Sequence, residues 1–222
     1  MFPHLNNKPS VHFLNEARFS DLSHPNISSI VSVEEDIVCQ DSNEQNIHTS
    51  SITYEYLPNG TLHDLMSNGE DDSMDETLTR TLFHQLIEGL SYLHSKKVAH
   101  LDIKPENIMF SEDLTLKIID FDLSKRVDES EIIHSQGTLN YRAPELTEKQ
   151  TIVEDAFKCD VYSAGIILFL MRSGGILPFN EVEEDRFAAE LKRMLSEEPS
   201  KFWGKHALIQ HRLKTHWSKD FQ

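Results

Sequence analysis

Three features are scarce in this chain: cysteine, basic charge and long apolar segments. Its 222 residues include two cysteines, Cys39 and Cys159, which provide no disulfide framework and indicate a reducing compartment. The formal net charge of −16 argues against a general nucleic-acid or anionic-membrane surface. The longest apolar stretch, around 166–171, is too short to cross a bilayer, and the first residues show no signal-peptide pattern. We therefore expect a globular protein in the cytoplasm, with the nucleus as the alternative.

The spacing of apolar residues predicts strands early in the chain and helices after them. Helical periodicity predicts helices over 11–23, 77–95, 158–171 and 184–195. Alternation and short apolar runs predict strands over 27–33, 51–56, 107–110 and 116–119. The polar, acidic stretch over 34–49 is expected to be a loop.

Three short motifs in the second half of the chain carry the most information. They are His-Leu-Asp-Ile-Lys-Pro-Glu-Asn at 100–107, Asp-Phe-Asp at 120–122 and Ala-Pro-Glu at 143–145. The first aspartate stands five residues before the asparagine and eighteen before the aspartate that begins the second motif. A lone His-x-Asp would be weak evidence, because most such residues are solvated or cap a helix. Together, in this order and at these distances, the motifs resemble the catalytic half of a eukaryotic protein kinase of the Ser/Thr type.

The resemblance implies an α+β, protein kinase-like bilobal fold. The N-lobe would be reduced to a helix plus about two strands, and the C-lobe would be mainly helical. The partial N-lobe and hinge would occupy 1–57, and a C-lobe lacking its last helices would occupy 58–222, so the match is expected to be truncated at both ends. The implied activity is transfer of the ATP γ-phosphate, with Mg²⁺, to hydroxyl groups of a protein substrate. The implied partners are ATP and that protein, with no nucleic acid and no membrane.

The catalytic and metal-binding roles carry over residue by residue. Asp102 matches the base that accepts the proton of the substrate hydroxyl, and Lys104 is similar to the lysine that steadies the γ-phosphate. The Thr138 hydroxyl would bridge these two side chains. Asn107 and Asp120 match the two Mg²⁺ ligands, and hard oxygen ligands suit that ion.

The nucleotide-binding residues follow from a looser match. Tyr54-Glu55-Tyr56-Leu57 is similar to the hinge, so backbone groups of Glu55 and Leu57 would bond the adenine edge, with Tyr54 at the gatekeeper position. Met109 would pack beneath the ring, although a core residue without that role would look the same. Glu106 would reach the ribose or a basic residue of the substrate.

The first departures from the family lie near the start of the chain. The sequence contains no Gly-x-Gly-x-x-Gly motif, and no lysine is placed to pair with the helix glutamate, since Lys8 is too close to it. Glu16 resembles that glutamate, but the helix is about one residue short before His24, so Asn15 is the alternative.

Other departures lie within the motifs. Leu101 replaces the arginine that would receive an activation-loop phosphate, so we expect that loop phosphorylation is not the switch. Ser124, Ser130 and Ser135 are candidates for phosphorylation in that loop, although serine is common in loops. Asp122 replaces a glycine and restricts the backbone there. Glu145 would lack the arginine that the last helices supply. Asp160 resembles the aspartate that braces the catalytic loop, although an N-cap role alone would also explain it.

These departures leave two rivals to an active kinase. A pseudokinase or scaffolding module without phosphotransfer would explain the missing glycine-rich loop and strand lysine. A fragment without a stable fold is the third possibility. The complete set of catalytic and metal-binding residues favours the kinase.

Overall fold

The computed structural model describes residues 2–3, 9–40, 45–67, 73–127, 136–146 and 155–178. The described helices are α1 (Val11–Ala17), α2 (Leu62–Ser67), α3 (Glu76–Ser95) and α4 (Ala156–Ser173). The strands are β1 (Phe2–Pro3), β2 (Ile30–Gln40), β3 (Asn46–Tyr54), β4 (Val98–Ala99), β5 (Ile108–Phe110), β6 (Leu116–Ile118) and β7 (Lys125–Arg126). Short 3₁₀ turns cover Pro105–Asn107, Leu139–Tyr141 and Pro144–Leu146. The helix expected over 184–195 lies outside the described residues.

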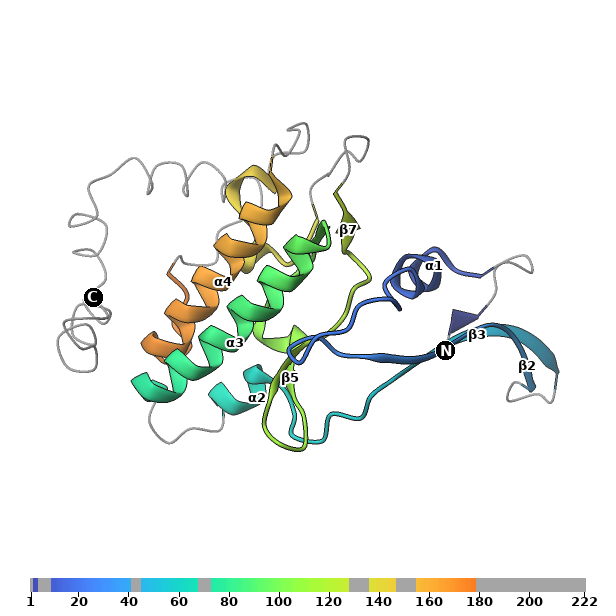
Figure 1. Cartoon of the computed structure of the whole chain (residues 1–222), viewed down its shortest axis with the longest axis horizontal. Helices are drawn as coiled ribbons and strands as arrows, with labels where there is room; N and C mark the ends of the chain where they lie inside the picture. The colour runs from blue at the N-terminus through green and yellow to red at the C-terminus, as the bar shows by residue number, and fades with distance from the viewer. Residues whose placement is uncertain are drawn as a thin grey trace.

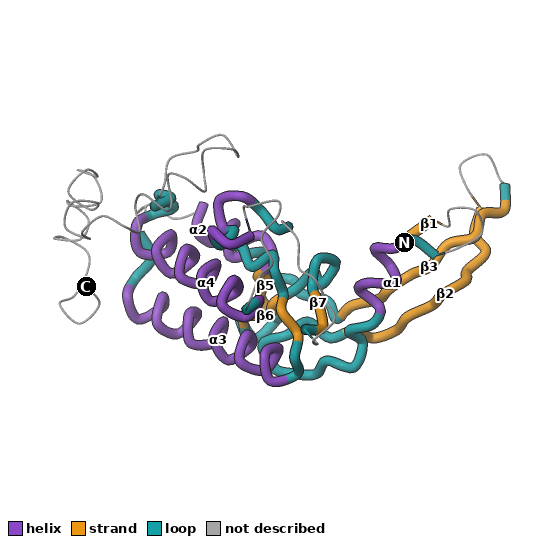
Figure 2. The backbone as a smooth tube through the Cα atoms, turned by 90° about the horizontal axis from the view of Figure 1, so that it is seen from above, coloured by secondary structure: helices purple, strands orange, loops and turns teal. Residues whose placement is uncertain are grey.

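The elements fall into two groups. Strands β1–β3 and helix α1 form a sheet region at one end of the molecule, and α2–α4 with β4–β7 form a helical region at the other (Figure 1). Seen from above, the β2–β3 hairpin projects away from the helices, and α1 lies beside it (Figure 2).

The sheet region is an antiparallel sheet in the order β1-β3-β2. The long hairpin pairs Ile30 with Tyr54 at its base and Gln40 with Asn46 at its tip, with two irregularities in register between. The loop expected over 34–49 is therefore wrong for most of its length. Side chains along this part of the hairpin are largely exposed on both faces, so no alternation of apolar and polar residues marked it as strand.

Helix α1 is shorter than the periodicity predicted. It begins after Ser10, whose hydroxyl accepts a hydrogen bond from the Phe13 N–H at 3.2 Å, and it ends at Ala17 rather than near 23. Phe19 and Leu22 extend the apolar spacing past that end because they enter the core from the turn that follows the helix. Phe13 is fully buried, and its ring packs against Phe2 of β1 at 5.6 Å.

The helical region is built on α3 and α4, which pack together (Figure 1). Asp75 caps α3 by accepting hydrogen bonds from the Thr77 and Leu78 N–H groups, and this confirms the helix expected over 77–95. Within α3, a Cβ atom on Gly89 would press on Ile118 of β6, so a residue without a side chain allows the helix to approach the strand. None of the described helices has both the length and the hydropathy needed to span a membrane.

The main hydrophobic core lies in the helical region and takes in the segment between α1 and β2. It contains Phe19 and Ile27 from that segment, Phe121 from the Asp-Phe-Asp motif, and apolar side chains of α3 and α4. The short pairs β5–β6 and β4–β7 lie next to this core and support the loops between them. The site described below is therefore carried by loops whose neighbours are fixed by packing.

Candidate active site

The backbone of the catalytic loop is held by one buried carboxylate. Asp160, on α4, accepts hydrogen bonds from the N–H groups of His100 at 2.9 Å and Leu101 at 2.7 Å, and its carboxylate lies 2.8 Å from Nε2 of His94. The backbone of Leu101 has a φ of 66°, which is unusual for a residue other than glycine, and the bonds to Asp160 hold it in this conformation. The bracing expected of Asp160 is present, while the N-cap of α4 is Asp155.

Asp102, Lys104 and Thr138 meet in one contact set. The Thr138 N–H and hydroxyl both donate to Oδ1 of Asp102 at 2.8 Å, and Nζ of Lys104 lies 2.8 Å from Oδ2. The Lys104 ammonium also donates to the Thr138 hydroxyl at 3.0 Å. The hydroxyl therefore bridges the aspartate and the lysine, as the resemblance implied. Burial disfavours the charge on Asp102, but hydrogen bonds from Lys104 and Thr138 outweigh it and hold the pKa of this carboxyl below its usual value.

Gly137 allows this contact set to close. Its φ is 89°, in the region that favours glycine, and a Cβ atom here would collide with the carbonyl oxygen of Leu101. The segment that carries Thr138 thus passes directly against the catalytic loop.

Asn107 and Asp120, the predicted metal ligands, each carry a side-chain oxygen. The amide nitrogen of buried Asn107 donates to the backbone oxygen of Asp102 at 3.0 Å and to its Oδ2 at 3.1 Å, which leaves the amide oxygen to bind a cation. Asp120 has an exposed side chain and a φ of 64°. Among the described residues, no three His, Cys, Asp or Glu side chains form a metal cluster. Two protein oxygens, with water and phosphate completing the shell, suit Mg²⁺.

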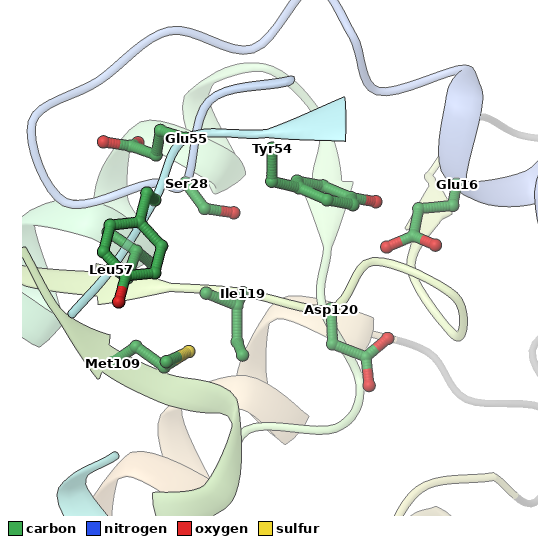
Figure 3. A pocket seen from close by; sticks show the side chains of 9 residues that line it. Glu16, Ser28, Tyr54, Glu55, Leu57, Met109, Ile119 and Asp120 are labelled. Atoms are coloured by element: carbon green, nitrogen blue, oxygen red, sulfur yellow. The ribbon is translucent and has the colours of Figure 1, made fainter. Parts of the chain in front are cut away.

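A cavity of about 400 Å³ lies between the hinge and Asp120. Figure 3 shows Glu55 and Leu57 on one side, Met109 below, and Tyr54, Glu16 and Asp120 toward the other end. The sequence-predicted hinge residues, Met109 and Asp120 therefore share one pocket. Glu106, which is exposed in the 3₁₀ turn at 105–107, does not line it.

The predicted hinge is fixed by the backbone and side chain of Glu55. The Glu55 N–H donates to the Ser29 oxygen at 3.0 Å, and the Glu55 carboxylate accepts from the Ser29 N–H at 2.7 Å and from Lys117 at 2.9 Å. Within the described part of the chain, no backbone hydrogen bond uses the Leu57 N–H. Burial opposes the charge of Glu55, yet the bonds from Lys117 and Ser29 lower its pKa.

The two candidates on α1 for the family's helix glutamate position, Glu16 and Asn15, make different contacts. The Glu16 carboxyl points into the pocket near Tyr54 (Figure 3), and burial raises its pKa, with the charge of Asp120 adding to the effect. The Asn15 amide instead donates to backbone oxygens of Phe121 at 3.5 Å and of Asp122. Strand β1 (Phe2–Pro3) pairs with β3 at Ser50 and Thr49. Lys8, which the sequence analysis considered as a partner of Glu16, lies outside the described residues.

The structure also shows the surroundings of Leu101 and Ser124, two residues that bear on phosphorylation of the loop. Leu101 is buried in a second apolar cluster with Ala143 and Leu146, where no phosphate could be received, although the regulation of the loop stays a prediction. Ser124, a phosphorylation candidate, is fully buried, and its hydroxyl donates to the His100 oxygen at 3.2 Å. That candidate is therefore inaccessible in this structure, and the other two, Ser130 and Ser135, lie outside the described residues.

Some pocket residues were not found from the sequence. Ser28 and Ile119 line the cavity beside the predicted hinge segment 54–57. Ile119 directly precedes Asp120, so its position could have been inferred. Ser28 lies before β2 in a stretch without a motif, and nothing in the sequence marked it.

Comparison with solved structures identifies the fold. The chain is similar to the yeast RNA Pol II CTD kinase in the crystal structure of the CTDK-1 complex, with a TM-score of 0.70 and 21% sequence identity, covering 96% of this chain and 67% of that one. This confirms the expected kinase-like α+β bilobal fold. The model of the protein kinase domain family matches residues 4–219, and the chain belongs to that family.

Curated relatives are Ser/Thr and calcium-dependent kinases. Calcium-dependent protein kinase 6 of Plasmodium berghei is 35% identical over 178 residues, covering 76% of this chain and 11% of that protein. CBL-interacting protein kinase 26 of Oryza sativa subsp. japonica is 41% identical over 133 residues, covering 57% and 25%. The serine/threonine-protein kinase stk11 homolog of Dictyostelium discoideum is 37% identical over 127 residues, covering 55% and 22%. The chain thus spans a quarter or less of the length of these relatives.

Proposed function

We propose that the chain is a serine/threonine protein kinase domain that transfers the γ-phosphate of ATP to a hydroxyl group of a protein substrate. The observation that carries this is the contact set of Asp102, Lys104 and Thr138. An ionised carboxylate, an ammonium group and a hydroxyl are held together beside the two oxygen ligands Asn107 and Asp120.

Asp102 has the properties of the group that receives the substrate hydroxyl. Its lowered pKa keeps it ionised at neutral pH, and bonds from Thr138 and Asn107 fix its direction. Lys104 adds a positive charge 2.8 Å from this carboxylate, at a position where charge on a transferring phosphoryl group would be stabilised. The remaining contribution of these residues is orientation, which is the main demand of phosphoryl transfer.

Asn107 and Asp120 would hold Mg²⁺, which supplies neutralisation of phosphate charge when it is bound. The Glu55 carbonyl and the Leu57 N–H would bond the adenine edge, with Met109 beneath the ring. Glu106 is left for the ribose or for a basic residue of the substrate, since its side chain is exposed beside the site.

The experiment is transfer of labelled γ-phosphate from Mg²⁺-ATP to a generic protein substrate by the 222-residue chain. Asp102→Asn keeps the shape of the side chain but removes its ability to accept the proton, so we expect the rate to fall about 10²-fold or more. Asp36→Asn, in the remote hairpin, is the matched control and should leave the rate unchanged. Transfer that persists in Asp102→Asn would contradict the proposal. Nucleotide binding by the wild-type chain without any transfer would favour the pseudokinase instead.

A further inference from the structure

Helix α1 makes an unusual attachment to the motif that carries Asp120. Nδ1 of His12 lies 2.8 Å and 2.7 Å from the two carboxylate oxygens of Asp122, and the amide of Asn15 donates to the Asp122 backbone oxygen. His12 and Asn15 are three residues apart, so they lie on the same helical face. Two side chains of α1 therefore hold the same residue from a distant part of the chain.

Asp122 stands where the family has glycine, and the backbone does not explain it. Positive φ values among the described non-glycine residues include Asp120 but not Asp122. This conformation therefore does not require the freedom that glycine supplies. What the aspartate adds is a carboxylate, and that carboxylate binds His12.

The attachment reaches Asp120 directly. The Asp122 N–H donates to Oδ1 of Asp120 at 3.3 Å, so Asp122 contacts both α1 and the proposed metal ligand. A further bond from Arg18 to the Ser124 oxygen at 3.2 Å ties the end of α1 to the same segment. Fixing Asp122 thus restricts the turn from which the Asp120 carboxylate projects.

We propose that His12 and Asp122 form an anchor that positions Asp120 for Mg²⁺ by fastening α1 to residues 120–124. The role of the anchor rests on the proposed function, because Mg²⁺ binding has a purpose here only with nucleotide. His12 and Asp122 are positioning residues, since neither lines the pocket.

The chain contains a matched pair for comparison. Nδ1 of His48 lies 2.7 Å from Oδ1 of Asp36, and this pair bridges β2 and β3 away from the pocket. Its histidine is 47% exposed and its aspartate 61%, against 71% and 29% in the anchor. The two pairs share their chemistry, and only one of them contacts the Asp120 segment.

The first test is amide hydrogen exchange of α1 and residues 120–124 in the chain without nucleotide. His12→Ala and Asp122→Asn should each speed exchange about two- to fivefold, the size expected for a partly exposed pair. The double variant should exchange no faster than either single variant, and His12→Lys should restore slow exchange. His48→Ala should not affect α1. Unchanged exchange in His12→Ala, or additive effects in the double variant, would overturn the anchor.

The second test separates positioning from mere stability. Binding of ATP is measured against Mg²⁺ concentration and also with the metal removed. His12→Ala should raise the Mg²⁺ concentration for half-maximal binding about two- to fivefold and leave metal-free binding unchanged. Equal loss in both conditions, or no change in the Mg²⁺ dependence, would contradict the positioning role. A wild-type chain that binds no nucleotide would refute the proposed function, while the exchange result would still decide whether the anchor exists.

Discussion

The two sides of the site are held by different kinds of contact. On the helical side, Asp160, Asp102 and Asn107 are buried, and each makes several hydrogen bonds to the catalytic loop or within it. On the sheet side, α1 is fastened by the mostly exposed His12 and by partly buried bonds of Asn15 and Arg18 to residues 121–124. Buried networks cost much to disrupt, whereas exposed pairs contribute little. The groups proposed for chemistry are thus held by buried bonds, whereas the bonds of α1 to residues 121–124 lie nearer the surface.

The largest effect is expected from breaking the buried side at Asp160. Asp160→Ala leaves the N–H groups of His100 and Leu101 without their partner, and each such loss costs about 1–3 kcal/mol. We expect the free energy of unfolding to fall by about 3 kcal/mol in urea denaturation. Asp36→Ala, on the exposed hairpin, is the control. Equal losses of unfolding free energy in the two variants would show that the buried hydrogen bonds of Asp160 stabilise the chain no more than an exposed pair does.

A smaller but more local effect is expected at Gly137. Gly137→Ala strains the positive φ and forces the backbone away from the Leu101 oxygen, which moves Thr138 from Asp102. The phosphotransfer rate should fall about tenfold or more, while ATP affinity stays within about twofold. Gly175→Ala has a similar φ of 75° but open space around the added carbon, so it separates strain from collision. An unchanged rate in Gly137→Ala would contradict the proposed contact set.

The ion pair of Glu55 with Lys117 should contribute about 0.5–1 kcal/mol to the free energy of unfolding, and this contribution should depend on pH. The pKa of Glu55 is lowered in the folded chain, so the carboxylate contributes stability above its unfolded pKa and loses it as pH falls through the folded pKa. Glu55→Gln should therefore be less stable than the wild type at about pH 7, and the difference should vanish near pH 3. A difference that stays constant between these pH values would show that the Lys117 contact is not electrostatic.

The two cysteines should differ in reactivity without any change in stability. Cys159 is buried on α4, and burial raises the pKa of its thiol, so little thiolate is available. Cys39 lies on β2, where it is partly exposed. Alkylation of the native chain at about pH 8, followed by mass spectrometry, should label Cys39 first and Cys159 only after denaturation. Equal labelling would show that α4 opens as readily as the hairpin.

The helical region was predictable because its signals are strong. Helix α3 and strands β5 and β6 were placed within one residue at each end, since a core-facing helix and short apolar strands have clear periods. The hairpin was not predictable between 34 and 49, because strands exposed on both faces carry no alternation. Helix α1 was extended too far because Phe19 is a core residue outside the helix.

Some contacts of the candidate site could likewise be predicted from the sequence, and others could not. Asp102, Lys104 and Asn107 come from one motif, whose spacing fixes its own local geometry, and Thr138 followed from the resemblance. The contact of His12 with Asp122 joins residues 110 positions apart, and neither belongs to a pattern that predicts a partner. Such a pair is visible only once the fold brings α1 to the motif.

We propose that Asn107, Asp120 and the pocket together form a site for Mg²⁺ and ATP. The test is calorimetric titration of ATP into the wild-type chain and into Asp120→Asn, with and without Mg²⁺. We expect Mg²⁺ to strengthen ATP binding in the wild type but not in Asp120→Asn, because the charged one of the two proposed metal ligands is then neutral. ATP binding that is indifferent to Mg²⁺, or equally strengthened by it in both chains, would contradict this proposal.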